Sequence, residues 1–188
     1  MAQRIAKINM VTIIFESHGT TLDNELRKAS GWHDIELSEL GKRQAEELGE
    51  RYKNEQVDAV FCSDLQRSYR TAEIAFAGKN MPIIKNERLR ECNYGDFTGR
   101  SSEEVELAKP KHIVESFPNG ESYEQATERI RNFLKDLLHN YNGKKIIIVG
   151  HRATQYGLER WINHIPLSRS IATPWKWQPG WTYILSVL

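Results

Sequence analysis

Three short apolar runs, separated by long polar or amphipathic stretches, limit the folds open to this chain. The runs are rich in β-branched residues and cover residues 10–15 (MVTIIF), 57–62 (VDAVFC) and 145–149 (KIIIV). Short runs of this kind, bounded by polar residues, are typical of strands buried on both faces of a sheet. We therefore expect three central strands, and the last run has the most uniform pattern.

The segments between these runs carry apolar residues at helical spacing. Ser38 and Ser122 are suited to cap two of the helices, and Ser63 or Asp64 is suited to cap a third. We predict helices over residues 39–52, 65–76, 122–140 and 154–163, and two further strands over 81–84 and 182–188. This alternation predicts an α/β fold, a three-layer sandwich with a mostly parallel central sheet and helices on both faces. A length of 188 residues suits one domain over residues 1–188.

The composition excludes several classes of partner. The 26 basic and 25 acidic residues leave a net charge of +1, so no long-range field attracts nucleic acid or an anionic membrane. No run approaches eighteen apolar residues, and the first ten residues lack the apolar core of a signal peptide. The two cysteines, Cys62 and Cys92, form no C-x-x-C pair or disulfide framework. We therefore expect reduced thiols in a cytoplasmic protein, and the sequence leaves its oligomeric state open.

Three polar side chains follow the apolar runs. His18 comes just after the first run, Arg67 lies in the first turn of the helix after the second, and His151 follows the third. The carboxyl ends of parallel strands meet at one edge of a sheet, where ligands bind in open α/β folds. The sequence therefore predicts that these three side chains converge on one site.

A series of motifs in order along residues 10–155 resembles the histidine phosphatase superfamily, also called the phosphoglycerate mutase-like family. The matching segments are His18-Gly19-Thr20-Thr21 with Asn24, Gly31-Trp32-His33-Asp34 with Leu37-Ser38 and Gly41, Ser63-Asp64-Leu65-Gln66-Arg67 with Thr71-Ala72, Arg88-Leu89-Arg90-Glu91 with Gly95 and Gly99, Pro118-Asn119-Gly120-Glu121-Ser122, and Gly150-His151. So many motifs in the right order make the match specific. The resemblance implies a phosphatase or a mutase that carries the phosphoryl group on a histidine.

The residue types suit that chemistry. A phosphate monoester repels anionic nucleophiles, so a neutral imidazole at His18 is a sensible attacking group. Arg67 can bind two phosphate oxygens with its planar guanidinium, and His151 can donate a hydrogen bond to a third. Glu91 is the candidate that protonates the leaving oxygen and later takes a proton from water. No cluster has metal-ligand spacing, so we expect no cofactor and no metal.

The chain departs from the family pattern at two positions. The residue before the nucleophile is Ser17, where the family has a phosphate-binding arginine, and the usually small residue after the second histidine is Arg152. We expect Arg152 to supply the missing guanidinium; the alternative is an exposed arginine at a helix start. Asn24 is expected either to contact phosphate or to cap a turn.

The acid-carrying loop favours a phosphatase over a mutase. Phosphoglycerate mutases of this family have an arginine directly after the acid, whereas this chain has Cys92 there. The segment between Glu91 and Pro118 is also too short for the mutase insertion. We therefore expect hydrolysis of small phosphate monoesters through a phosphohistidine on His18. The alternatives are a phosphoglycerate mutase-type phosphotransferase, or a non-catalytic phosphate-binding domain that has lost the arginine at Ser17.

The aromatic stretch over residues 174–181 contains three tryptophans, Trp175, Trp177 and Trp181. Such a stretch can pack a long loop against the core, or it can form a wall of the substrate pocket. Both interpretations stay open from the sequence.

Overall fold

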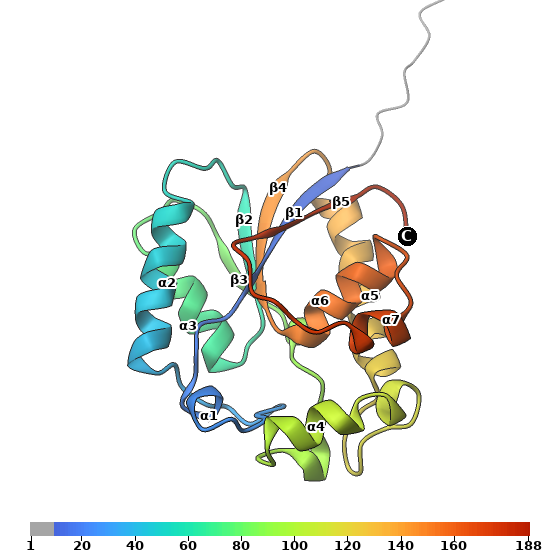
Figure 1. The fold of residues 1–188 in the computed structure, drawn as a ribbon. Helices are drawn as coiled ribbons and strands as arrows, with labels where there is room; N and C mark the ends of the chain where they lie inside the picture. Colours follow the sequence, from blue (N-terminus) through green and yellow to red (C-terminus); the bar gives the residue numbers. More distant parts are fainter. Residues whose placement is uncertain (1–9) are drawn as a thin grey trace, which may run out of the picture.

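The computed structural model describes residues 10–188 and contains a five-stranded sheet of order β3-β2-β4-β1-β5 (Figure 1). The strands are β1 (Val11–Ser17), β2 (Ala59–Cys62), β3 (Ile83–Lys85), β4 (Lys145–Gly150) and β5 (Trp181–Leu185). β1 to β4 are parallel, and β5 runs antiparallel to β1. The predicted mostly parallel sheet is therefore confirmed. The prediction about a signal peptide falls on residues 1–9, which lie outside the described residues.

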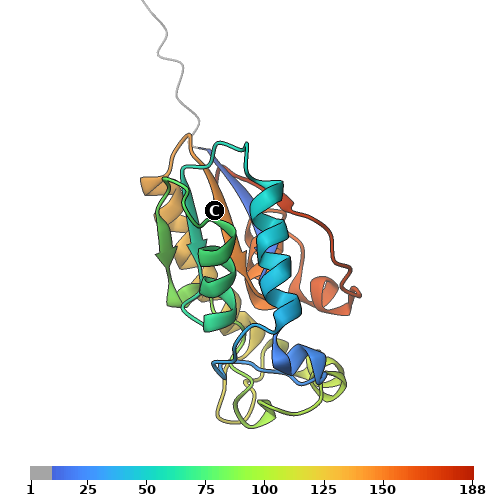
Figure 2. The ribbon, with the colours of Figure 1, turned by 90° about the vertical axis from the view of Figure 1, so that its left-hand side faces the viewer.

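Helices cover both faces of the sheet, as the sequence predicts. Figure 2 shows α2 (Glu39–Arg51) and α3 (Gln66–Ala75) in front of one face. The opposite face is covered by α5 (Tyr123–Asn140) and α6 (Arg152–Trp161). These layers form the predicted three-layer sandwich.

Successive side chains of a strand point to opposite faces of the sheet, so each apolar run packs against the helices on both sides. Ile146 and Ile148 of β4 pack in the cluster that includes residues of α5 and α6. Ile147 and Val149 point the other way and pack with residues of α2 and α3. All four are fully buried, which accounts for the absence of any polar residue at these positions.

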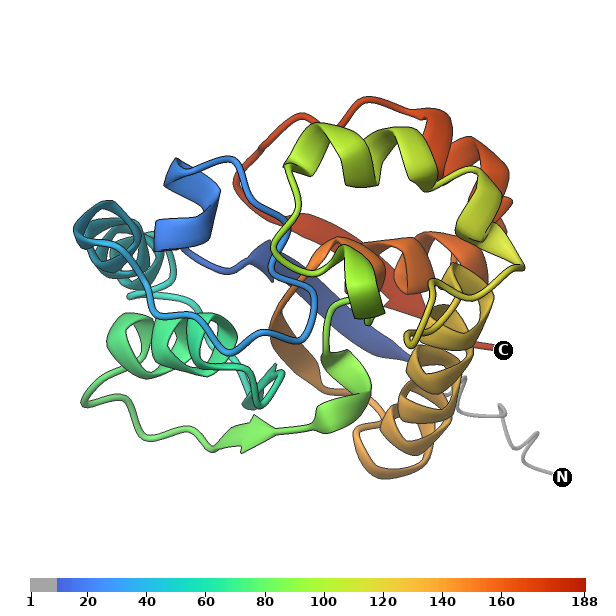
Figure 3. The same cartoon turned by 90° about the horizontal axis from the view of Figure 1, so that it is seen from below.

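Short helices cover the carboxyl edge of the sheet, below the strands in Figure 1 and toward the viewer in Figure 3. They include α1 (Leu22–Glu25) and α4 (Ser102–Ala108), and α7 (Leu167–Ala172) lies beside α6. Three single turns of 3-10 helix complete the covering: Glu87–Leu89, Gly95–Phe97 and Lys111–Ile113. The sequence analysis did not predict these elements, because segments this short show no clear periodicity.

Several predicted boundaries are wrong by a few residues. β1 continues to Ser17 and α6 begins at Arg152 rather than at 154. α3 is preceded by Leu65 at its N-cap, with no side-chain cap, so neither Ser63 nor Asp64 occupies that position. Ser63 instead accepts a hydrogen bond from the backbone N–H of Leu65 and faces His151.

Within residues 10–188, no helix combines the length and the apolar character needed to cross a membrane.

Candidate active site

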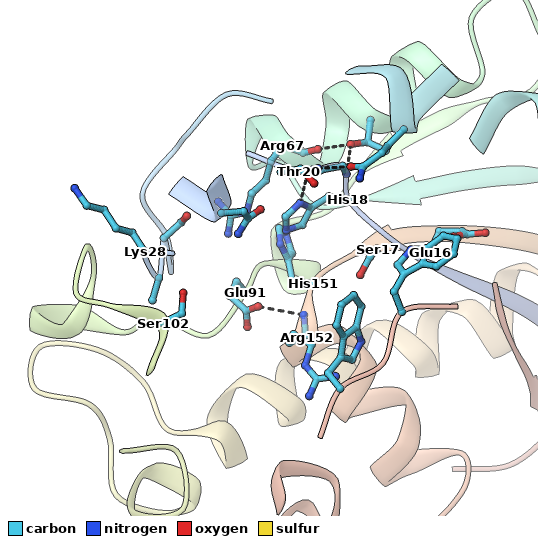
Figure 4. Close-up of a pocket in the computed structure, with 18 of the residues that line it drawn as sticks. Glu16, Ser17, His18, Thr20, Lys28, Arg67, Glu91, Ser102, His151 and Arg152 are labelled. Carbon is cyan, nitrogen blue, oxygen red and sulfur yellow. Dashed lines mark hydrogen bonds between the residues drawn. The ribbon is translucent and has the colours of Figure 1, made fainter. Parts of the chain in front are cut away.

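A cavity of about 710 Å³ lies at the carboxyl edge of the sheet, where the loops after β1 and β4 meet the start of α3. Its walls come from segments that are far apart in the sequence, and Figure 4 shows their side chains converging on it. All seven residues that the sequence analysis selected line this cavity: Ser17, His18, Asn24, Arg67, Glu91, His151 and Arg152. The topology therefore brings together the three residues predicted to converge, His18, Arg67 and His151, and the other four line the same cavity.

The ring of His18 is oriented by its own loop. Its Nδ1 lies 2.7 Å from the carbonyl oxygen of Gly19, so Nδ1 carries the proton and donates it to that carbonyl. Burial, followed by the nearby Arg67 guanidinium, lowers the pKa of His18 from 6.5 to about 3, against the opposing effect of the Gly19 hydrogen bond. His18 is therefore neutral at physiological pH, and its Nε2 presents a free lone pair.

The loop that carries His18 is fixed on both sides. The backbone N–H of His18 donates to Gly150, and that of Gly19 donates to the Thr71 hydroxyl of α3. The start of α2 packs so closely on this loop that a Cβ at Gly41 would collide with the backbone of Thr20. The ring consequently projects from a rigid turn.

Arg67 is 2% exposed, and the segment before α2 orients its guanidinium. Its Nη1 and Nη2 donate to the carbonyls of His33 and Gly31, at 3.0 and 2.7 Å. That segment is in turn tied to α3, because Asp34 accepts from the backbone N–H of Gln66 at 2.7 Å. These contacts hold the planar cation in place before any ligand arrives, which is what bidentate binding of an anion requires.

His151 stands beside His18, with ring centres 5.0 Å apart. Its Nε2 is hydrogen-bonded to Ser63 Oγ at 2.6 Å. Burial, followed by Arg67, lowers the pKa of His151 well below its usual value, so the ring is neutral. Ser63 Oγ also accepts from the backbone N–H of Leu65. The Nδ1 of His151 is buried and has no hydrogen-bond partner within residues 10–188.

Glu91 is held by three backbone N–H groups. Oε1 accepts from Cys92 and Ala153 at 2.7 and 3.1 Å, and Oε2 accepts from Arg152 at 3.1 Å. Two of these donors belong to the first turn of α6, where the helix dipole favours a carboxylate. Oε2 accepts one bond and keeps a second lone pair, which can hold a proton.

The loop around Glu91 is anchored by an arginine that the sequence analysis missed. Arg129 of α5 donates to the carbonyls of Arg88 and Glu91 at 2.7 and 2.8 Å and pairs with Glu121 at 2.7 Å. Trp32 donates its indole N–H to the same Glu91 carbonyl at 2.6 Å. The sequence shows Arg129 only as a basic residue within an amphipathic helix, and that position does not specify which groups it contacts.

Ser17 and Asn24, which we expect to contact the substrate, both line the cavity. Ser17 ends β1 and pairs with Gly150 in the sheet register. Asn24 accepts from the backbone N–H of Thr21 at 3.0 Å, so it takes part in the capping box of α1. The capping role considered for Asn24 is present, and Asn24 also lines the cavity.

Arg152 lines the cavity, but its side chain extends away from His18 (Figure 4). The guanidinium donates to the Tyr156 hydroxyl at 2.9 Å and to Gln155 at 3.4 Å. It also lies 5.5 Å from the centre of the Trp175 ring. The predicted contact between Arg152 and the transferred phosphoryl group is thus not formed in this conformation and stays a prediction.

The tryptophan stretch contributes to the wall of the cavity. Trp175 and Trp177 line it and are 41% and 57% exposed. Arg51 lies 5.8 Å from the centre of the Trp177 ring, and Trp175 stacks near Trp181. The sequence leaves two interpretations of this stretch open, and Trp175 and Trp177 fit the one in which it forms a wall of the pocket.

Three further groups lie near the site. Cys92 is fully buried, and burial raises its pKa far above the usual range. Arg88 and Arg90 pair with Asp136 and Asp64 at 2.8 and 2.5 Å. In the described part of the chain, no group of three or more His, Cys, Asp or Glu side chains is placed to hold a metal ion.

Comparison with known proteins decides the family. The family model of the histidine phosphatase superfamily (branch 1) matches residues 13–183. The chain belongs to the histidine phosphatase superfamily. The resemblance inferred from the motifs is therefore confirmed, and the chain is a phosphatase of this superfamily.

Relatives and solved structures agree with this assignment. The chain is 36% identical to the uncharacterized phosphatase PhoE of Bacillus subtilis (strain 168), over 79% of this chain and 76% of the relative. It is 34% identical to phosphoserine phosphatase 1 of Hydrogenobacter thermophilus (strain DSM 6534 / IAM 12695 / TK-6), over 76% and 71% of the two chains. Phosphoglycerate mutases are also among the relatives. The structure of Bacillus stearothermophilus YhfR superimposes with a TM-score of 0.79 at 27% identity, over 93% of this chain and 90% of that one.

Proposed function

We propose that this histidine phosphatase hydrolyses small phosphate monoesters by transferring the phosphoryl group to Nε2 of His18. The observation that carries the proposal is the state of this ring. Its Nδ1–H is bonded to Gly19, its pKa is about 3, and its free nitrogen faces a cavity shared with Arg67, Glu91 and His151. A fixed neutral nitrogen is the nucleophile that attack on an anionic ester requires.

The reaction then has two steps. In the first, His18 Nε2 forms a bond to phosphorus, the bond to the leaving oxygen breaks, and Glu91 protonates that oxygen. In the second, water attacks the phosphohistidine and gives its proton to Glu91, and inorganic phosphate and neutral His18 are released. The free lone pair of Glu91 Oε2 is the position that holds the transferred proton.

Arg67 and His151 balance the charge of the transferred group. The oriented guanidinium of Arg67 binds phosphoryl oxygens, and a ring N–H of His151 donates to another. Ser17, Asn24 and Arg152 are proposed to contact the substrate from the cavity edge.

Two alternatives are less well supported. A mutase passes the phosphoryl group to an alcohol rather than to water, and this chain has Cys92 where the mutases of the family carry a substrate-binding arginine. A domain that only binds phosphate needs neither a rigidly held carboxylate nor a neutral nucleophile, and both are present here.

Hydrolysis of an aryl phosphate by the purified protein, with and without a chelator, tests the proposal. We expect release of phosphate into water at the same rate in both conditions, because histidine and arginine carry the charge. Activity that EDTA abolishes and a divalent ion restores would refute the mechanism. Release of the aryl alcohol only when an acceptor alcohol is supplied, with the phosphoryl group recovered as an ester of that alcohol rather than as inorganic phosphate, would favour the mutase. The single domain over residues 1–188 and the cytoplasmic location stay proposals.

A further inference from the structure

The wall of the cavity formed by α4 and α6 contains a buried lysine that the reaction above does not use. Lys109 lines the cavity and its side chain is only 2% exposed. A buried ammonium is costly unless it is well paired. Its ion-pair partner within residues 10–188 is Glu106, three residues earlier on the same helix, and that side chain is 59% exposed.

A second cation lies at the same part of the wall. The Nζ of Lys109 is 5.8 Å, and the guanidinium carbon of Arg152 4.8 Å, from the centre of the Tyr156 ring. Arg152 forms no ion pair with any carboxylate of the described residues; its side-chain partners are the neutral Gln155 and Tyr156. Of these two positive charges, only that of Lys109 has a carboxylate partner among residues 10–188, and that partner is the exposed Glu106.

The other carboxylates that line the cavity do not supply the missing charge. Glu91 is occupied by three backbone N–H groups. Glu16 accepts from Arg51 and from the Tyr52 hydroxyl at 3.1 and 2.6 Å. Glu47 belongs to α2, which forms a different part of the cavity lining together with Gln44 and Arg51. The wall made by α4 and α6 therefore keeps a local excess of positive charge in a protein whose net charge is only +1.

We infer that this wall binds a second anionic group on the substrate, so the preferred substrates are phosphate monoesters whose leaving group carries a carboxylate or a second phosphoryl group. The inference rests on the proposed function, because the wall adjoins the site where His18 takes the first phosphoryl group. The Arg152 backbone donates to Glu91 while its side chain runs along the wall, so the anion would sit on the leaving-group side of the acid.

A matched pair of esters tests the inference. 4-Carboxyphenyl phosphate and 4-carbamoylphenyl phosphate have similar leaving groups and shapes but differ by one negative charge. We expect wild-type kcat/KM to favour the carboxylate at least about tenfold, since a charge-assisted contact contributes roughly that much. A third ester with a phosphonate at the same position shows which of the two anions is preferred.

The variants Lys109→Met and Arg152→Met should each remove most of this preference, and Lys109→Met should change kcat/KM for the carbamoyl ester less than about threefold. Lys109→Arg should retain the preference, which separates loss of charge from loss of packing. Lys42→Met is the matched control, because Lys42 pairs with Glu39 at the same helical spacing and does not line the cavity. Thermal unfolding of each variant confirms that it is folded.

Equal rates for the charged and neutral esters on the wild type would overturn the inference, as would a preference that survives both substitutions. If Arg152→Met slows both esters equally, Arg152 binds the transferred phosphoryl group and the proposed anion site is wrong.

A binding measurement tests this inference independently of the catalytic mechanism. With His18→Ala, which cannot turn over by the proposed route, quenching of tryptophan fluorescence should still report tighter binding of the carboxylate ester. If the wild type hydrolyses neither ester, the proposed function fails, and this titration alone decides the inference.

Discussion

The two ends of the cavity are built in different ways. At the inner end, His18, Arg67, His151 and Glu91 are oriented by hydrogen bonds to backbone or to buried hydroxyl groups. At the outer wall, which consists of Trp175, Trp177 and the residues of α4 and α6 that line the cavity, the two tryptophans are partly exposed. Lys109 pairs there with Glu106, whose side chain is exposed. The inner end is preorganised for one reaction, whereas the outer wall can change without altering the chemistry. Substitutions at the inner end should therefore affect every substrate.

The largest effect is expected from His18→Ala. Removing the nucleophile eliminates the covalent route, so kcat should fall by at least about a thousandfold on any ester. Steady-state hydrolysis of an aryl phosphate measures this, with His139→Ala as the control because His139 is exposed at the end of α5. Undiminished activity of the His18→Ala enzyme would contradict the claim that the inner end of the cavity carries the chemistry.

A smaller loss is expected from Arg67→Met. Loss of a preorganised cation from a phosphoryl-transfer site should lower kcat/KM by roughly a hundredfold to a thousandfold. It should also lower the melting temperature, since the carbonyls of Gly31 and His33 lose their donors. Arg70→Met is the matched control, because Arg70 is one turn away on α3 and pairs with Glu73 at the surface. If Arg67→Met and Arg70→Met behave alike, Arg67 is not a phosphate ligand.

Glu91→Gln should discriminate between leaving groups. An alkoxide needs a proton to leave and an aryl oxide needs it less, so the loss on alkyl phosphates should exceed that on aryl phosphates by about tenfold or more. Parallel kinetics on one alkyl and one aryl ester measure the ratio, and Glu87→Gln, at an exposed position, is the control. Equal losses of activity on both esters would show that Glu91 is not the general acid.

The smallest expected effect concerns stability and pH. The pKa of His18 in the folded chain is about 3, and that of His151 is also well below 6.5, the value expected when unfolded. Below pH 6.5 the unfolded chain therefore binds protons that the folded chain does not, so the free energy of unfolding should fall as the pH falls toward 3. Urea unfolding at pH 7 and pH 5 should show a smaller decrease for His18→Gln than for the wild type. An identical decrease in the two proteins would contradict the neutral, buried state of His18.

The sequence predicts the inner end better than the outer wall, for physical reasons. His18 and His151 follow short apolar strands with a clear pattern, and the parallel pairing of these strands places both residues at one edge. Lys109 lies directly after α4, a helix of seven residues with no recognisable periodicity, so nothing in the sequence places it in the cavity. Ser63 was misassigned as a possible helix cap, because a serine after a strand is equally suited to bind a neighbouring side chain. The direction of the Arg152 side chain depends on Tyr156 and Trp175, which no local pattern connects to it.

Trapping the phosphorylated enzyme tests the central claim most directly. The wild type is mixed for milliseconds with a labelled aryl phosphate, quenched in alkali, digested and analysed by mass spectrometry. We expect label that is stable in alkali and labile in acid, located on the peptide that contains His18 and absent from His18→Ala. Turnover without any such label, or label on a different residue, would contradict the account.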